Sequence, residues 1–306
     1  MDSSELISVL HSELDARRLS DGWQLKSGRS IESLCFQILA LRRETHELER
    51  TLSFIESLQG RDGAWPAVVG DEEPSAWTTA LATLVLLTTG RNSHLRGAIE
   101  WLVQSKGREA NWFWRWKFRN LDPEVKFDPA KYGWSWVPGT TSWVVPTAMS
   151  TIALQKVRQA GIVAADALND RIEMGIAMLL DRMCPGGGWN SGNGVAFGVA
   201  LDPYIDTTAV ALLALQQRQH GMVMESLSRM IVGLTECSSP YSAAWGILAL
   251  TLHRGRIQPG DPLQESVRRL IAAIEADLGT LDTVTLAICA LALAAVDGDN
   301  VFTVPA

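Results

Sequence analysis

The sequence predicts an all-α fold in which six helical hairpins close into an (α/α)6 toroid that carries a short β-hairpin-like insert. A short loop that ends on tryptophan recurs along the chain, a small Ala/Leu/Thr-rich helix follows each loop, and an amphipathic helix precedes it. An open array of repeats needs polar helices at both ends, but the last helical segment is among the most apolar. We therefore expect a closed ring, with residues 1–306 as one domain and residues 106–140 as a flap.

The recurring loops contain polar or glycine residues and close on a tryptophan. Glycine permits backbone conformations with positive φ, and a buried indole N–H needs a local acceptor. We interpret these tryptophans as structural residues that pack between neighbouring helices. The four loops end at Trp23, Trp65, Trp112 and Trp189.

Two kinds of helix alternate around the predicted ring. The small-residue segments are apolar on nearly every side, so we place them inside; the segments before the loops have one apolar stripe, so we place them outside. The inner helices are expected at 30–41, 75–87, 142–154, 206–215, 240–252 and 282–295, with Ser30, Ser75, Ser142, Asp206 and Asp282 as N-caps. The outer helices are expected at 50–58, 95–104, 171–183, 225–235 and 266–277.

The insert has an unusual aromatic pattern. Trp112, Trp114, Trp116 and Phe118 recur at every second position, which predicts an extended segment that pairs with the stretch around Trp134. Residues 106–131 contain seven basic and four acidic side chains. Two interpretations follow: an aromatic flap over the ring mouth, whose basic side binds a phosphate or carboxylate, or an aromatic plug packed on the core. In the first, the ligand contacts are Trp114, Arg115, Trp116 and Lys117.

Composition and charge exclude several classes of protein. The 306 residues are 47% apolar and 20% charged, and no apolar run is long enough to span a membrane. The net charge of −7 predicts neither nucleic acid nor an anionic membrane surface as a partner. Residues 1–5 do not begin a secretory signal, so we expect a cytoplasmic protein. The sequence has no phosphate-binding glycine motif and no metal-ligand spacing of histidine or cysteine, so we expect no cofactor and no metal.

The loops and their helices resemble the repeats of the terpenoid cyclase and protein prenyltransferase superfamily. The segment 59–65 reads Q-x-x-D-G-x-W, as in that superfamily. Segments 133–143 and 185–193 further resemble bacterial single-domain proteins described as prenyltransferase/squalene oxidase repeat proteins. The resemblance implies an α/α toroid whose central cavity takes an apolar, isoprenoid molecule.

The catalytic motifs of that superfamily are mostly absent. Segment 204–209 takes the place of the D-x-D-D-T-A motif of class II cyclases and keeps only the middle acid, Asp206. Thr208 and Ser242 stand where protein prenyltransferases have the cysteine and histidine that bind zinc. The resemblance therefore implies that this chain is not a zinc-dependent protein prenyltransferase.

Asp206 is the carboxylate that the sequence singles out, and it has two interpretations. Burial among aromatic side chains would raise its pKa and allow it to act as a general acid. The helix N-terminus favours the ionised form, which would make Asp206 an ordinary N-cap. The ring-lining aromatic residues expected beside it are Trp77, Trp143, Tyr204, Tyr241 and Trp245.

Three functions remain open on this sequence. The first is a terpenoid-cyclase-like protein that holds an isoprenoid against aromatic faces, where carbocations are stabilised, and starts cyclisation or isomerisation by protonation. The second is a non-catalytic module that binds a lipid, peptide or protein partner on the same toroid. The third is a carbohydrate-active toroid with tryptophan platforms and two carboxylates.

Overall fold

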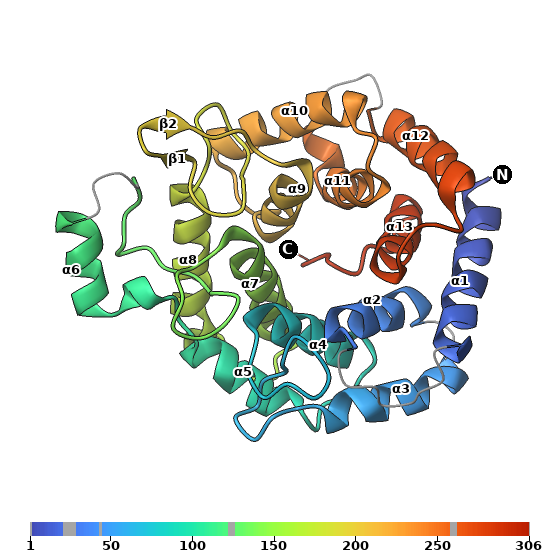
Figure 1. The fold of residues 1–306 in the computed structure, drawn as a ribbon, viewed down its shortest axis with the longest axis horizontal. Helices are drawn as coiled ribbons and strands as arrows, with labels where there is room; N and C mark the ends of the chain where they lie inside the picture. Colours follow the sequence, from blue (N-terminus) through green and yellow to red (C-terminus); the bar gives the residue numbers. More distant parts are fainter. Residues whose placement is uncertain (1, 21–28, 43–44, 122–125, 258–261, 306) are drawn as a thin grey trace.

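The computed structural model describes residues 2–20, 29–42, 45–121, 126–257 and 262–305, and it confirms an all-α toroid. Six inner helices surround the centre of the ring and six outer helices pack behind them (Figure 1). The inner helices are α2 (Ile31–Leu41), α4 (Ala76–Thr88), α7 (Val144–Gln159), α9 (Ile205–Ala214), α11 (Pro240–Leu252) and α13 (Thr283–Val296). The outer helices are α1 (Ser3–Ser20), α3 (Thr45–Ser57), α5 (Leu95–Gln104), α8 (Asp166–Asp181), α10 (Gly221–Glu236) and α12 (Pro262–Asp277).

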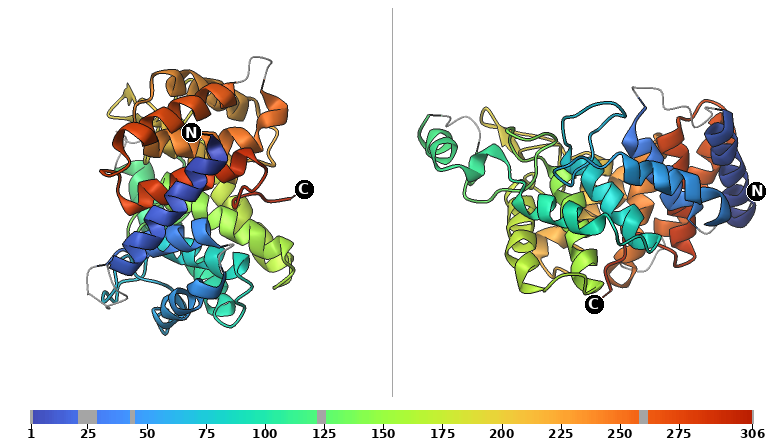
Figure 2. Two further views of the ribbon diagram at one scale, coloured as in Figure 1. Left: turned by 90° about the vertical axis from the view of Figure 1, so that its right-hand side faces the viewer. Right: turned by 90° about the horizontal axis from the view of Figure 1, so that it is seen from below.

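The ring is closed. Each inner helix packs against the next one along the chain, and α13 packs against α2. Helix α1, which the sequence analysis did not predict, packs against α13 and buries Leu6, Leu10 and Leu14. Their four-residue spacing is the helical signal that could have revealed it. The loops that precede the inner helices lie on one face of the ring, which we call the front face, and the C-terminus lies on the other (Figure 2).

The loop tryptophans hold neighbouring helices together through one repeated arrangement. The Trp65 indole N–H donates to the Ile55 carbonyl at 2.7 Å, and its backbone N–H donates to the Thr79 hydroxyl at 3.0 Å. The same two bonds recur at Trp134, with Leu102 and Thr147, and at Trp189, with Leu179 and Thr208. All three side chains are fully buried, so every indole N–H has its acceptor inside the core.

The third tryptophan of this set was predicted wrongly. Trp134, and not Trp112, makes the repeated bonds, because the insert enters the chain before the loop tryptophan. Trp112 is instead 76% exposed. The number of residues from the tryptophan to its threonine is 13 for Trp134, 14 for Trp65 and 19 for Trp189, so this spacing varies between repeats. Trp23 lies outside the described residues.

The predicted strand in the insert is a helix, α6 (Trp112–Asn120), reached through the 3-10 turn η1 (Arg108–Ala110). Its N-cap Asn111 accepts a hydrogen bond from the Phe113 amide, and rings three or four residues apart contact each other, such as Trp114 and Phe118 at 6.1 Å. These capping and i, i+4 contacts outweigh the period-two pattern. The described part of residues 106–140 contains no strand; the hairpin of this fold is formed by β1 (Val195–Ala196) and β2 (Val199–Ala200).

Two further features complete the fold. A second 3-10 turn, η2 (Arg254–Arg256), follows α11. No helix within the described ranges has the length and apolar character needed to cross a bilayer.

Candidate functional site at the ring mouth

Equivalent positions of the inner helices meet at the front face. The second residue of each inner helix occupies the same place in the repeat, where the helix enters the ring. We call this set, together with the N-cap Asp282 of α13, the ring mouth. The six second residues are Glu32, Trp77, Val145, Asp206, Tyr241 and Val284. The mouth therefore combines carboxyl groups with aromatic and aliphatic side chains.

Glu32 has the environment of a proton donor, and the sequence analysis missed it. Burial raises the pKa of its carboxyl group, the adjacent Trp77 side chain opposes this rise, and the Asp282 carboxylate adds to it. Six helix N-termini point to the same mouth, and their dipoles favour ionised carboxylates. At Glu32 the effect of burial is the stronger one. The glutamate at this position of α2 was visible in the sequence, but nothing there showed its burial.

Asp206 and Asp282, both read as N-caps from the sequence, differ in the structure. Asp282 caps α13 by accepting hydrogen bonds from the amides of Val284 and Thr285 at 2.9 and 3.0 Å. Partial burial acts to raise the pKa of Asp282, but the bonds from the Thr285 hydroxyl and these amides outweigh it, and the pKa is lowered. Asp206 is not an N-cap, because Tyr204 takes that position of α9. Asp206 is half-buried in the first turn.

The phenol of Tyr241 lies within the electrostatic influence of all three carboxyl groups of the mouth. Burial raises the pKa of this phenol, the Trp245 side chain opposes this rise, and the charges of Glu32, Asp206 and Asp282 add to it. These groups come from α2, α9 and the start of α13, and α2 and α9 lie on opposite sides of the ring. The mouth is thus an acidic site in which the phenol stays protonated.

Aromatic rings form the floor of the mouth. Phe36 lies one helical turn below Glu32, and Trp245 lies one turn below Tyr241. The two rings contact each other at 5.8 Å across the ring centre, since α2 and α11 are separated by α13. Trp77 contacts Phe36 at 6.3 Å and Trp136 at 5.9 Å. The buried Trp245 indole N–H has no hydrogen-bond partner within the described ranges.

The C-terminal segment closes the ring from the other side. Phe302 is fully buried and contacts Trp245 at 5.5 Å, so the rings of Phe36, Trp245 and Phe302 occupy the ring centre. The Asn300 amide donates to the Leu248 carbonyl at 2.9 Å. The segment also borders a cavity of about 580 Å³ on this rear face, lined in part by Arg42 and Lys156. The deep central cavity that we expected is therefore filled below the mouth.

The predicted ligand-contact residues fall into separate groups. Trp77, Asp206, Tyr241 and Trp245 belong to the mouth or its floor. Trp143 lines a side cavity of about 230 Å³ that also contains Phe118, Phe127 and Arg182. Tyr204 is exposed and lines a cavity of about 450 Å³ between α9 and α10. The structure therefore does not bring these residues into one site.

The insert residues form a group of their own at the edge of the ring. Trp114 lies between the Arg108 guanidinium, at 4.5 Å, and the Lys117 ammonium, at 4.8 Å. Arg115 donates to the Ala110 carbonyl, and Trp116 is exposed. Helix α6 has no buried residue and stands at the outer edge of the ring (Figure 1), so it is neither a plug on the core nor a flap over the ring centre.

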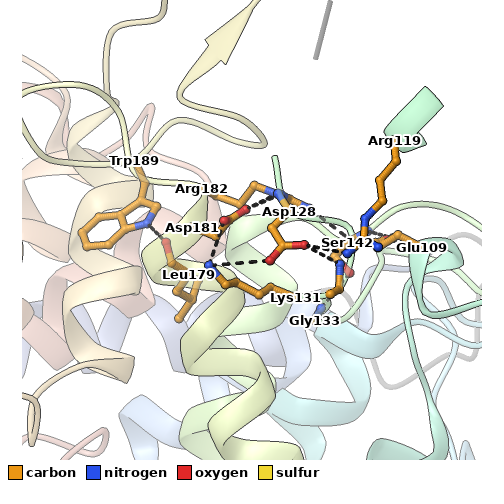
Figure 3. A network of polar contacts seen from close by, with 11 residues as sticks. Glu109, Arg119, Asp128, Lys131, Gly133, Ser142, Leu179, Asp181, Arg182 and Trp189 are labelled. Atoms are coloured by element: carbon orange, nitrogen blue, oxygen red, sulfur yellow. Dashed lines mark hydrogen bonds and ion pairs between the residues drawn. The ribbon is translucent and has the colours of Figure 1, made fainter. Parts of the chain in front are cut away.

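A buried charge network fixes the base of the insert (Figure 3). Glu109 is fully buried, accepts from the Ser142 amide at 3.2 Å and pairs with Arg182 at 3.7 Å. Arg182 also pairs with Asp181 at 2.8 Å, and Lys131 approaches Asp181 at 3.2 Å. Burial lowers the pKa of Arg182, but these carboxylates act to raise it and keep the guanidinium paired. The network has a structural role, because its charges already satisfy one another.

The described residues offer neither a metal-binding cluster nor a reactive buried thiol. The described ranges contain no group of three or more His, Cys, Asp or Glu side chains that could hold a metal ion. Burial raises the pKa of Cys289 to about 12, and burial also raises the pKa of Cys35. Both thiols stay protonated at neutral pH, so neither is a ready nucleophile.

Comparison with known proteins places the fold. No family model matches the chain, and no curated sequence matches it. The solved structure of a GH76 α-mannanase from Bacteroides thetaiotaomicron is 10% identical, with a TM-score of 0.65 over 98% of this chain and 96% of that one. A type II terpene cyclase from Scytonema is 12% identical, with a TM-score of 0.60 over 97% and 99% of the two chains.

The chain has the α/α-toroid fold of these proteins. A third similar structure, ent-copalyl diphosphate synthase from Streptomyces platensis, is 17% identical with a TM-score of 0.57. It is matched over 87% of this chain, which spans half of the length of that synthase. At these identities the likeness establishes only the α/α-toroid fold, which terpene cyclases and GH76 enzymes share. The residues of the mouth have to carry any argument about function.

Proposed function

We propose that the ring mouth binds an apolar, isoprenoid molecule and that Glu32 donates the proton that starts its cyclisation or isomerisation. The observation that carries this proposal is the position of Glu32: a carboxyl group whose burial opposes ionisation, beside the aromatic rings of Trp77 and Tyr241. An acid of this kind is what alkene protonation requires. The terpene cyclases of the same fold support the choice of substrate class by analogy.

The chemical step uses groups that the mouth contains. The Glu32 O–H bond breaks as the π electrons of a carbon–carbon double bond form a new C–H bond, leaving a carboxylate and a carbocation. Electron-rich faces of Trp77 and Tyr241 stabilise the cation by cation–π attraction. A ring closure follows when a second double bond attacks the cation, and loss of a proton to a carboxylate returns a neutral product. Asp206 is half-buried at the same mouth and is our candidate for this base.

Asp206 as the initiating acid remains the rival assignment. Its carboxyl group lies in the first turn of α9, at the same mouth. Glu32 is likewise half-buried, and burial raises the pKa of its carboxyl group. The aromatic floor of Phe36 and Trp245 limits the ligand to the mouth, so we propose a shallow site in place of a deep central cavity.

The test is product analysis by gas chromatography after incubation with polyprenyl diphosphates and squalene-like hydrocarbons. We expect Glu32→Gln to lose turnover by a factor of about 10² to 10⁴, the usual contribution of a general acid. Glu72→Gln, at an exposed position outside the mouth, is the matched control and should keep full activity. Full activity in Glu32→Gln, with loss only in Asp206→Asn, would transfer the acid role to Asp206. Ligand binding without product would favour the non-catalytic module.

A glycan-cleaving enzyme is the second candidate, and one observation favours it. Glu32 and Asp206 stand on opposite inner helices at one mouth, as a pair of glycosidase carboxylates would, and mannanases share the fold. Release of mannose from α-1,6-linked mannotriose, abolished by both Glu32→Gln and Asp206→Asn, would establish this function. Turnover of an isoprenoid without cleavage of the glycan would exclude it.

A further inference from the structure

We propose that the end of the molecule that carries α6 docks onto an anionic lipid bilayer. Apolar side chains project there from two separate elements, α6 and the β1–β2 hairpin. On α6, Trp112, Phe113 and Trp116 share one face and are 76%, 47% and 51% exposed. On the hairpin, Phe197 is 73% and Val199 is 62% exposed. Large apolar side chains so exposed on two neighbouring protrusions mark an interaction surface.

Helix α6 presents its aromatic face because its other face is occupied. Trp114 and Phe118 contact each other, and Phe118 contacts Phe127 at 5.2 Å. These contacts, together with η1, hold the helix at the edge of the ring, where Trp112, Phe113 and Trp116 remain exposed. Figure 1 shows α6 standing apart from the inner and outer helices. The Trp112 face therefore stays open in the folded chain.

The hairpin presents its phenylalanine in a costly backbone conformation. Phe197 has φ of +52° and Gly198 has φ of +76°, so both central residues of the turn are left-handed. This region favours glycine or asparagine, and a bulky side chain there is strained. Phenylalanine at this exposed tip does not contribute to the stability of the fold. The residue is explained if its ring enters an apolar phase.

Local charge identifies the partner. Helix α6 contains Arg115, Lys117 and Arg119 and no acidic residue, although the whole chain has a net charge of −7. Arg119 pairs with Asp128 at 3.6 Å, so the excess positive charge comes from Arg115 and Lys117. Aromatic side chains next to basic ones are typical of helices that lie at the surface of anionic membranes. The whole-chain charge argued against such a surface, but basic residues act within about a Debye length, so the local charge decides.

The shape of the surface favours a bilayer over a protein partner. In the right-hand view of Figure 2, α6 and the hairpin both lie toward the front face at one end of the molecule. An extended planar partner can contact two protrusions at once. The exposed acidic residues Asp71, Glu72 and Glu73 belong to a loop of the same face, so the contact is confined to the end with α6. Docking would turn the ring mouth toward the lipid, although the inference does not depend on the proposed function of the mouth.

Flotation of the whole chain with phosphatidylcholine vesicles, with and without 30% phosphatidylglycerol, tests this inference. We expect binding to the anionic vesicles that weakens with salt. The triple variant Trp112→Ser, Phe113→Ser and Trp116→Ser should lose at least tenfold in partitioning, and Phe197→Ser should lose severalfold. Replacing Lys117 with serine should cost about fivefold. Val232→Ser, which removes an apolar residue exposed on α10, is the matched control and should bind like the original chain.

Several results would overturn the proposal. Equal binding to vesicles without phosphatidylglycerol would remove the role of charge. Anionic vesicle binding that survives the triple α6 variant would place the contact elsewhere. Failure to bind vesicles, with a dimer by light scattering that the triple variant abolishes, would make a second copy of the chain the occupant. Far-ultraviolet circular dichroism establishes that each variant is folded, so that lost binding reports on the surface.

Discussion

Tryptophans of the ring and tryptophans of the insert have opposite environments. Trp65, Trp134 and Trp189 are fully buried, and each makes the same two hydrogen bonds to an outer helix and an inner helix. Trp112 and Trp116 are exposed on a helix that has no buried residue. Tryptophan therefore stabilises the fold where it belongs to the repeat. Where the insert interrupts the repeat, tryptophan is exposed and contributes little to stability.

The carboxyl groups at the mouth show the same division. Asp282 is bound by the first amides of its helix, as a structural N-cap is. Glu32 is placed where burial opposes its charge. A carboxylate whose hydrogen bonds are made within the fold contributes stability. A carboxyl group whose charged form is disfavoured by its surroundings is a candidate for function. The following predictions test this division.

The largest effect is expected where a loop tryptophan is removed. Trp189→Ala should lower the free energy of unfolding by about 3 to 5 kcal/mol, because it leaves a cavity and deprives the Leu179 carbonyl of its donor. Trp112→Ala should change it by less than about 0.5 kcal/mol, as exposed substitutions do. Urea unfolding measures both. Equal losses in the two variants would contradict the division.

A smaller effect is expected at the threonine that completes the arrangement. The Thr208 hydroxyl accepts from the Trp189 amide at 2.9 Å and donates to its carbonyl at 3.2 Å. Thr208→Val leaves the buried Trp189 amide without an acceptor, whereas the Trp189 carbonyl keeps its bond from the Tyr204 amide. The variant should cost about 1 to 3 kcal/mol. Thr235→Val, at an exposed position, serves as the control in the same thermal unfolding series. A neutral Thr208→Val would mean that the tryptophan packs without needing these bonds.

The two aspartates of the mouth should differ in stability and in pH dependence. Asp282→Ala should cost about 0.5 to 2 kcal/mol, whereas Asp206→Ala should cost little, because only Asp282 caps its helix. The pKa of Asp282 is lowered in the folded state, so its contribution is present above the ordinary value of 3.8 and is lost as the pH falls through the folded value. Unfolding curves between pH 2 and pH 7 check this. A larger loss in Asp206→Ala would reverse the assignment.

The smallest change in stability is expected for Glu32→Gln. The folded-state pKa of Glu32 lies above its ordinary value of 4.5, so ionisation disfavours folding as the pH rises above 4.5. Because glutamine cannot ionise, the variant should match the original chain at pH 4 and equal or exceed it at pH 7. Glu236→Gln, at the exposed end of α10, is the control in the same denaturation measurements. A clear loss of stability in Glu32→Gln at pH 7 would make Glu32 a structural residue.

The repeat made the ring predictable from the sequence. The recurrence of loop tryptophans and small-residue helices predicted the inner helices and their order. A helix that is buried on all sides is apolar on all sides, and this pattern can be recognised from the sequence alone. The insert was not predictable in the same way. Its period-two pattern suggested a strand, but Asn111 and the i, i+4 ring contacts of α6 produce a helix.

The candidate site was only partly predictable. Asp206, Tyr241, Trp77 and Trp245 were identified because they stand near inner-helix starts, and the structure places them at the mouth or its floor. Glu32 was missed because its raised pKa depends on burial in the folded ring and on the charge of the distant Asp282, which no local pattern reports. The filling of the ring centre by Phe302 likewise depends on where the C-terminal segment folds back.

Titration of the Glu32 side-chain carboxyl by ¹³C NMR, assigned with Glu32→Gln, tests the central claim most directly. A midpoint above 4.5 is expected, because burial and the nearby Asp282 both oppose ionisation. In Asp282→Asn the midpoint should fall, since a like charge is removed while the cap is retained. A midpoint at or below 4.5 that Asp282→Asn leaves unchanged would contradict the assignment of Glu32 as the proton donor of the ring mouth.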